Sequence, residues 1–349
     1  MVSDDLLRTL GYRHFEFANV VINCDPIVTS HFEHTSKNST GLLFLLPNEI
    51  LQEIFLDMDL HSLLMCRSLC QHARSLISGV HQFRRFLKTS PSEITALLRT
   101  GTARYFSLRH LYGELCTSRC HACGNFGGFL FLPRGLRCCM LCIRTNIDLM
   151  PLTKSEAKRA FGLTEKALLR ANTPILHTLI GEYGINGYGG IRRGFENSLF
   201  LVSRISVKEF MQRELNATQQ KKQDRYKFKT NRRLEKLSGL PTWPDCGSDS
   251  LTVDHSFRFQ CVTQFPYFKP TIPQSGKDGG LCCLPCKVHF NTNSTTILTF
   301  SAYKKWMGLY VIAYSEEDLV EHVKQCPASK EYVQDILKHA AEVVSAHWK

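Results

Sequence analysis

Residues 43–77 read LFLLPNEILQEIFLDMDLHSLLMCRSLCQHARSLI, and this stretch decides the fold of the N-terminal part. Pro47 suits the first turn of a helix, because its missing N–H would have no partner there. The side chains that follow give an apolar face too wide for a lone surface helix: Ile50, Leu51, Ile54, Phe55 and Met58. Asp59 is expected to cap a second short helix, and a third helix follows around Ala73. Three such helices bury little area alone, so the unit is expected to pack on more protein or on a partner.

This stretch resembles an F-box. The matching features are the run Leu46-Pro47-x-Glu49-Ile50-Leu51, the pair Asp59-Leu60, the pair Leu63-Leu64 and the pair Leu69-Cys70. In that family the helices bind a Skp-type adaptor, which links them to a cullin scaffold that carries ubiquitin-conjugating machinery. The resemblance implies that the adaptor is contacted by Leu46, Pro47, Ile50, Leu51, Ile54 and Leu64. The alternative is an ordinary helical subdomain whose leucine face is buried in its own protein.

Fifteen cysteines set the chemistry of the rest of the chain. The N-terminus has no positive stretch followed by an apolar segment, which argues against a secretory signal. No apolar run approaches the roughly 18 residues that a membrane-spanning helix needs. We therefore expect a cytoplasmic or nuclear protein with no membrane partner. In a reducing compartment cysteines are thiols or metal ligands, and an odd number excludes complete disulfide pairing.

The first cysteine cluster has the spacing of a zinc site, with two C-x2-C pairs separated by fifteen residues. The predicted ligands are Cys120, Cys123, Cys139 and Cys142. Gly124 relieves the turn after the first pair, and residues 129–132 are predicted to form a strand that brings the second pair back to the first. Four thiolates close a tetrahedral site, which is structural rather than catalytic. Cys138 is the rival of Cys139, and buried cysteines without metal are the alternative.

A second cluster lies toward the C-terminus. Ser315 and Asp318 predict a helix start and Pro327 a helix stop, so His322 and Cys326 lie four residues apart on one face. The predicted ligands of this enlarged zinc-finger-like site are Cys283, Cys286, His322 and Cys326. The rivals are Cys282 for Cys283 and His289 for His322. The alternative is a surface histidine with isolated thiols.

Both cysteine patterns resemble those of a large group of fungal F-box proteins. In that group the F-box precedes a C-x2-C pair, an apolar Gly-rich strand that ends near Leu-Pro, and an arginine-rich approach to a second C-x2-C. Here the strand corresponds to residues 128–133 and the approach to Arg137. The same group has a helix with His-x3-Cys near the position of His322. The resemblance supports two structural zinc ions.

The predicted fold class is α+β, with a three-helix F-box, a zinc-knuckle region and a mixed helix and strand C-terminal region. Thr153 and Glu156 form a capping-box pattern at the start of residues 151–180, which read as helical. Strands are expected at 296–300 and 309–314. The predicted divisions are a loosely ordered lead-in (1–40), the F-box (41–90), a four-cysteine knuckle region (104–150), a mainly helical middle region with a basic helix at 204–237 (151–237), and an irregular segment followed by a zinc-finger-like region (238–349).

The formal charge of +12 is concentrated in residues 204–236, which hold 11 Lys and Arg against 4 Asp and Glu. A solvated helix face explains such a run more often than nucleic-acid binding does. No serine–histidine–aspartate arrangement, paired carboxylates or HExxH motif can be singled out. The resemblance to F-box proteins implies a non-catalytic receptor subunit of a ubiquitin ligase, which holds an unknown protein substrate. A zinc-dependent nucleic-acid-binding protein is the alternative, and a metal-dependent hydrolase is a weaker one because it needs an open zinc position.

Overall fold

The computed structural model describes residues 9–13, 20–26, 46–161, 166, 173–183, 193–214, 255–269, 279–293, 312–335 and 338. These residues have the predicted α+β class, with helices concentrated before residue 116 and short strands after it. Among the helices of these ranges, none combines the length and the apolar character needed to cross a bilayer.

Short helices and short strands make up the described part of the chain. The α-helices are α2 (Asn48–Asp57), α3 (Leu60–Leu69), α4 (Gln71–Gly79), α5 (His81–Thr89), α6 (Pro91–Arg99), α7 (Leu108–Leu115), α8 (Met140–Thr145), α9 (Lys154–Phe161), α11 (Arg204–Glu214), α13 (Leu284–Asn293) and α15 (Glu316–Gln325). Short 3-10 helices are η3 (Thr102–Arg104), η4 (Ile147–Leu149) and η5 (His255–Cys261). The strands are β1 (Gly11–Tyr12), β2 (Phe129–Phe131), β3 (Leu136–Cys138), β4 (Pro151–Thr153), β5 (Ile175–His177), β6 (Gly181–Tyr183), β7 (Arg193–Phe195), β8 (Phe200–Ser203), β9 (Val262–Gln264), β10 (Leu281–Cys283) and β11 (Ala313–Tyr314).

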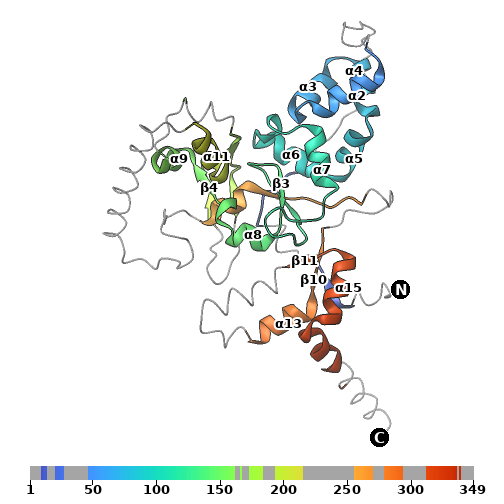
Figure 1. Ribbon diagram of the computed structural model, residues 1–349, viewed down its shortest axis with the longest axis vertical. Coiled ribbons are helices and arrows are strands. Elements are labelled where there is room, and N and C mark those ends of the chain that lie inside the picture. The colour runs from blue at the N-terminus through green and yellow to red at the C-terminus, as the bar shows by residue number, and fades with distance from the viewer. Residues whose placement is uncertain are drawn as a thin grey trace.

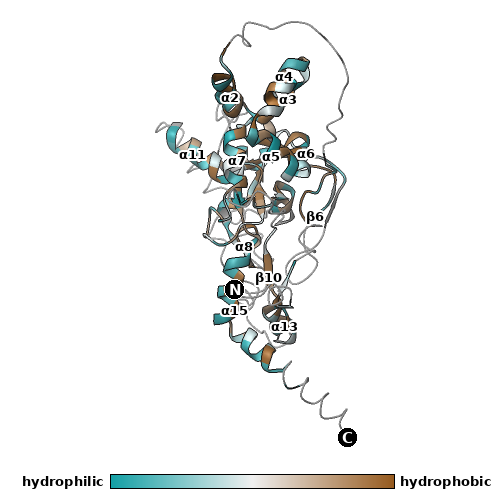
Figure 2. Cartoon of the chain, turned by 90° about the vertical axis from the view of Figure 1, so that its right-hand side faces the viewer, coloured by the Kyte–Doolittle hydropathy of each residue, from teal (hydrophilic) through white to brown (hydrophobic). Residues whose placement is uncertain are grey.

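The molecule is elongated, with different elements at its two ends. Figure 1 shows α2, α3 and α4 at one end and α13 and α15 at the other, with α8 and β3 between them. The view turned by 90° shows the same order along the long axis, with hydrophilic residues prominent on α15 (Figure 2). The elements α9 and α11 lie to one side of this axis (Figure 1). The two cysteine clusters of the sequence therefore fall at the middle and at the far end.

Local capping explains where the N-terminal helices start. The Asp59 side chain accepts a hydrogen bond from the Ser62 N–H (2.9 Å), which confirms the predicted cap of α3. The Cys70 sulfur takes the same role for α4, accepting from the Ala73 N–H at 3.4 Å. Because these caps separate α2, α3 and α4, the helices fold back on one another and share one apolar interior.

One hydrophobic core joins these helices to the cysteine-rich middle. Leu51 and Phe55 of α2 belong to the same cluster of buried side chains as Cys139 and Phe265. The rings of Phe86 and Phe265 meet edge to face, with centroids 6.3 Å apart. The three-helix unit thus packs on further protein of its own chain, as its small size requires.

The sheet nearest to this core has the strand order β3-β2-β9. The predicted strand at 129–132 is confirmed as β2, which pairs with β3 in the register Phe129↔Cys138. Its other neighbour is β9, where Phe131 lies opposite Val262. All three residues of β2 are buried, and β2 is the central strand, paired on one side with β3 and on the other with β9.

The predicted helix over 151–180 is confirmed in α9 and is wrong at residues 151–153 and 173–180. The capping box is confirmed, because the Thr153 N–H donates to Glu156 Oε2 (2.8 Å) and the Glu156 N–H donates to Thr153 Oγ1 (3.1 Å). However, β4 precedes α9, and β5 follows the undescribed residues after it. Both strands pair with β8 in a sheet of order β4-β8-β5. The strand that pairs with both, β8, begins only at residue 200, so the sequence near β4 and β5 carries no signal for strand pairing. The prediction of a mainly helical middle region is therefore wrong at these two strands.

The N-terminal lead-in is held in place wherever the structure describes it. Gly11 and Tyr12 pair with Cys283 and Cys282 in the sheet β1-β10-β11. Ile22 is 1% exposed, and its N–H donates to the Val262 carbonyl at 2.9 Å. The predicted loose ordering is therefore wrong for residues 9–13 and 20–26.

Several further predictions can be compared only in part. The basic helix is described as α11, and its continuation over 215–237 lies outside the described residues. The strand predicted at 296–300 lies outside them too, whereas that at 309–314 is described only in β11. The segment predicted as irregular contains η5, β9, β10 and α13.

Candidate metal centres and exposed helical surface

Exposed apolar side chains gather on the first two helices. The described residues expose nine large hydrophobic side chains, and four of these lie within residues 46–69. They are Leu46 (40% exposed), Ile50 (49%), Met65 (57%) and Leu69 (75%). Met65 and Leu69 lie four residues apart and thus share a face of α3. Such a concentration of exposed apolar area is typical of a protein-binding surface.

The residues predicted to contact an adaptor differ in their exposure. Leu46, Pro47 and Ile50 are exposed, and Ile54 and Leu64 are half-buried. Leu51 differs from them all, because it is only 1% exposed and packs in the core. Its expected contact with a partner is therefore corrected to a role in holding α2.

Sequence reasoning missed Met65 and Leu69 as contact candidates. The signal was available, since both lie on the side of α3 away from the fully buried Leu60 and Leu63.

An arginine outside the three-helix unit binds the acidic side of α2. Arg109 of α7 donates to Asp57 Oδ1 (2.7 Å) and to Glu53 Oε2 (2.6 Å). The hydrogen bond from Arg109 lowers the pKa of Asp57. These exposed pairs add little stability alone, and they link α7 to α2.

The first cysteine group is brought together as the spacing predicts. The ligand atoms of Cys120, Cys123, Cys139 and Cys142 all lie within 4.8 Å of one another. The sulfurs of Cys123 and Cys139 are 3.6 Å apart. Three of the four side chains are buried, and Cys123 is exposed. This geometry could hold one metal ion with no position left open for a substrate.

Two local features present these sulfurs. Gly124 has φ +78°, and its N–H donates to the Cys120 carbonyl (2.9 Å), which closes the predicted turn after the first pair. Cys139 is the N-cap of α8, and its sulfur accepts from the Cys142 N–H at 3.4 Å.

The neighbouring Cys138 lies outside the group. It is the last residue of β3, opposite Phe129, and is 1% exposed. Burial raises the pKa of the Cys138 thiol well above its ordinary value. Adjacent residues of an extended chain face opposite sides, so the Cys138 side chain packs in the core while that of Cys139 belongs to the ligand group.

The second group is also assembled. The ligand atoms of Cys283, Cys286, His322 and Cys326 lie within 4.8 Å of one another. Cys286 Sγ is 3.4 Å from both His322 Nε2 and Cys326 Sγ. The predicted helix start is confirmed, because the Ser315 side chain accepts from the Asp318 N–H at 3.1 Å. The Tyr314 ring stacks on the His322 ring with centroids 4.5 Å apart, which orients the imidazole.

Neither rival residue joins this second group. Cys282 is 2% exposed and faces away from the group on β10, and burial raises the pKa of its thiol to about 12. His289 Nδ1 lies 3.7 Å from Glu331 Oε2 instead. A three-thiolate, one-imidazole set could hold a metal ion with all four positions filled.

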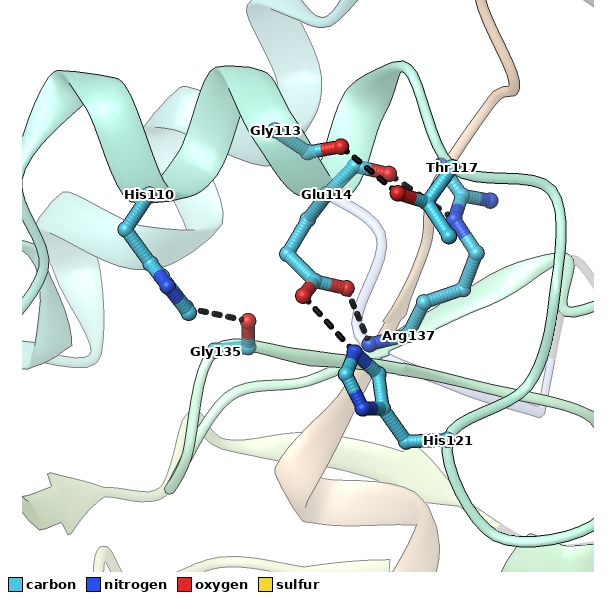
Figure 3. A network of polar contacts seen from close by, with 7 residues as sticks. All are labelled: His110, Gly113, Glu114, Thr117, His121, Gly135 and Arg137. Atoms are coloured by element: carbon cyan, nitrogen blue, oxygen red, sulfur yellow. Dashed lines mark hydrogen bonds and ion pairs between the residues drawn. The ribbon is translucent and has the colours of Figure 1, made fainter.

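The buried Arg137 and the neighbouring His121 both contact Glu114 in a network of polar contacts (Figure 3). The Arg137 N–H donates to Glu114 Oε2 (2.8 Å), and Arg137 Nε donates to the Glu114 carbonyl (3.0 Å). Its Nη1 donates to the carbonyls of Gly127 (2.5 Å) and Phe265 (2.9 Å). Glu114 Oε1 also lies 2.8 Å from Nε2 of His121, which lies between the first two cysteines in the sequence.

This arginine is fully buried, and burial lowers its pKa to about 10 while the charge of Glu114 opposes that change. It therefore remains charged at neutral pH and holds α7, the knuckle and the 265–266 segment together. No spacing signal in the sequence reveals this role.

Comparison with known families bears on the helical surface. Residues 43–85 match the family model of the F-box domain. The chain contains an F-box domain. The search of curated proteins and that of solved structures gave no match.

The F-box domain comprises α2, α3, α4 and the first part of α5. F-box domains bind Skp-type adaptors and are generally non-catalytic. In this chain the F-box presents Ile50, Met65 and Leu69 to solvent while its buried side joins the cysteine-rich core. Two groups outside the F-box, one of four cysteines and one of three cysteines and a histidine, could hold metal ions.

Proposed function

We propose that this chain is the substrate-recognition subunit of a Skp–cullin-type ubiquitin ligase. The observation that carries the proposal is the F-box domain at residues 43–85 with its exposed apolar side chains. The chain would not catalyse ubiquitin transfer, and would act inside the cell, where the adaptor and cullin are found. It would raise the effective concentration of a target lysine near the conjugating enzyme.

We further propose that each cysteine group holds one structural zinc ion. Sulfur and imidazole donors at tetrahedral count are the set that zinc prefers, and these donors lie close together in both groups. In such small regions the free energy of metal binding becomes folding free energy. The zinc ligands would be the eight residues of the two groups, with Cys138, Cys282 and His289 excluded.

The proposed division of labour follows the long axis. The F-box (41–90) would bind the adaptor, and residues 104–349 would hold the target. The shared core joins the F-box to the cysteine-rich middle and supports a fixed distance between these two parts. A fixed distance helps to present the same region of the target to the conjugating enzyme.

The test is co-purification of the full chain with a Skp-type adaptor. Ile50→Asp and Leu69→Asp each place a charge in the exposed apolar surface and should reduce adaptor binding strongly, because a buried unpaired charge is costly. The matched control is Ile180→Asp, since Ile180 is 69% exposed and lies outside the F-box. Adaptor binding that is unaffected by both F-box variants would refute the proposal.

The alternative of a nucleic-acid-binding protein draws on the basic charge of residues 204–236. In the described part of that run, Lys208 lies 4.0 Å from Asp148, and Glu209 pairs with Arg134 at 3.0 Å. These contacts favour a structural use of α11. Nucleic-acid binding that weakens steeply with salt would support the alternative.

A further inference from the structure

The two cysteine groups share a contact surface. Phe126 lies three residues after Cys123, and Gly280 lies three residues before Cys283. Phe126 is 2% exposed, and its ring lies directly against Gly280. A Cβ atom at Gly280 would lie 2.5 Å from Phe126 Cε1, and the residue has φ +77°. Only glycine fits this position without moving the ring.

A second contact flanks the first. Arg119 pairs with Phe126 as a β-bridge, so these two residues bracket Cys120 and Cys123. Arg119 Nη1 also lies 3.1 Å from Asp318 Oδ2, one turn before His322 on α15. Both residues that bracket the first cysteine pair therefore contact the unit that carries the second group.

A third contact runs alongside. Lys269 Nζ lies 2.5 Å from Glu317 Oε1 on α15, and the Phe126 ring meets the Tyr267 ring edge to face with centroids 6.4 Å apart. The strand β10 and the helix α15 supply ligands of the second group. They therefore line one side of residues 119–126, the knuckle loop that carries Cys120 and Cys123.

We infer that the two metal sites are coupled through Phe126 and Gly280, so that metal in the second site slows metal loss from the first. This inference rests on the proposed zinc sites. A metal ion in the second site fixes β10 against α15, which keeps Gly280 and Asp318 in contact with the knuckle loop. Loss of that ion lets β10 and α15 move relative to each other, and the loop that holds Cys120 and Cys123 then opens more readily. Linkage makes the effect reciprocal for the two binding equilibria.

The test uses the purified full chain. Native mass spectrometry first counts zinc, with two ions per chain expected. Iodoacetamide labelling in the presence of a chelator, followed peptide by peptide by mass spectrometry, then gives the rate at which Cys120 and Cys123 become reactive. Cys326→Ser removes one ligand of the second site, and should accelerate labelling of Cys120 and Cys123 roughly tenfold. Lys324→Ala, an exposed change on the same helix, should leave the rate unchanged.

Gly280→Ala gives an independent test, because it keeps every ligand. It should accelerate labelling of the same two cysteines, and adding Cys326→Ser should then give less than the product of the two single effects. The coupling is overturned, and the zinc assignment stands, if the unaltered chain binds two zinc ions and both variants are labelled at the unaltered rate. A chain that binds no zinc would overturn the coupling together with that assignment.

Discussion

The N–H of Leu60 donates a hydrogen bond to the carbonyl of Phe106 at 3.0 Å. This bond, with that from the Leu108 N–H to the Met58 carbonyl (3.1 Å), joins the α2–α3 connection of the F-box to the start of α7. Leu60 is fully buried in the core that also contains Cys120 and Cys139. The F-box and the first cysteine group therefore share one continuous hydrophobic core.

Chelation of metal should consequently loosen the F-box as well as the cysteine-rich region. We expect amide hydrogen exchange of residues 60–69 to become faster when a strong chelator is added, because their core loses the support of the first group. Hydrogen exchange measured by mass spectrometry checks this result. Exchange that accelerates only after residue 116 would show that the F-box is stable alone.

Neighbouring cysteines should differ in their effect on metal content. We expect Cys139→Ser to reduce the zinc count from two to one, because a ligand is lost. Cys138→Ser should keep both ions, since its side chain lies in the core. Elemental analysis of the purified variants gives the count. Equal counts in the two variants would contradict the assignment of ligands made from the structure.

Removal of the Arg137 guanidinium should strongly destabilise the chain. Arg137→Met keeps the backbone N–H that donates to the Glu114 carboxylate. It leaves four buried carbonyls without the guanidinium donor, those of Glu114, Gly127, Phe265 and Pro266, and should lower the free energy of unfolding by at least about 3 kcal/mol. Arg104→Met is the control, because Arg104 is exposed and its loss should cost no more than about 0.5 kcal/mol. Urea unfolding followed by circular dichroism measures both. Similar stabilities for the two variants would exclude a central role for Arg137.

The N-terminal strand should stabilise the second cysteine group. Deletion of residues 1–13 removes β1, together with the contact of Lys287 Nζ with the Tyr12 ring at 4.6 Å. We expect faster hydrogen exchange in residues 281–283, because the edge of β10 loses its partner. Deletion of residues 1–8 keeps β1 and serves as the control. The contribution of β1 would be disproved by identical exchange in the two truncated chains.

The parts that could be predicted from sequence are those encoded by short spacing. Asp59 and Ser315 predict the starts of α3 and α15. Both C-x2-C pairs in the first group belong to tight local turns. The choice of Cys139 over Cys138 follows from the same local rule. His322 could be selected because a helix places it one turn before Cys326.

The parts that could not be predicted depend on partners far along the chain. β2 is completed by β9 more than a hundred residues later, and β4 is paired by β8 some fifty residues later. Arg137 finds its acceptors at residues 265 and 266. No periodicity or spacing near these residues specifies which distant segment will pair with them.

This dependence on β9 has a consequence during synthesis. The F-box and the first cysteine pairs leave the ribosome long before residues 262–266, which close their sheet and receive the Arg137 guanidinium. The nascent chain must therefore carry this sheet without its third strand while residues 143–262 are being translated.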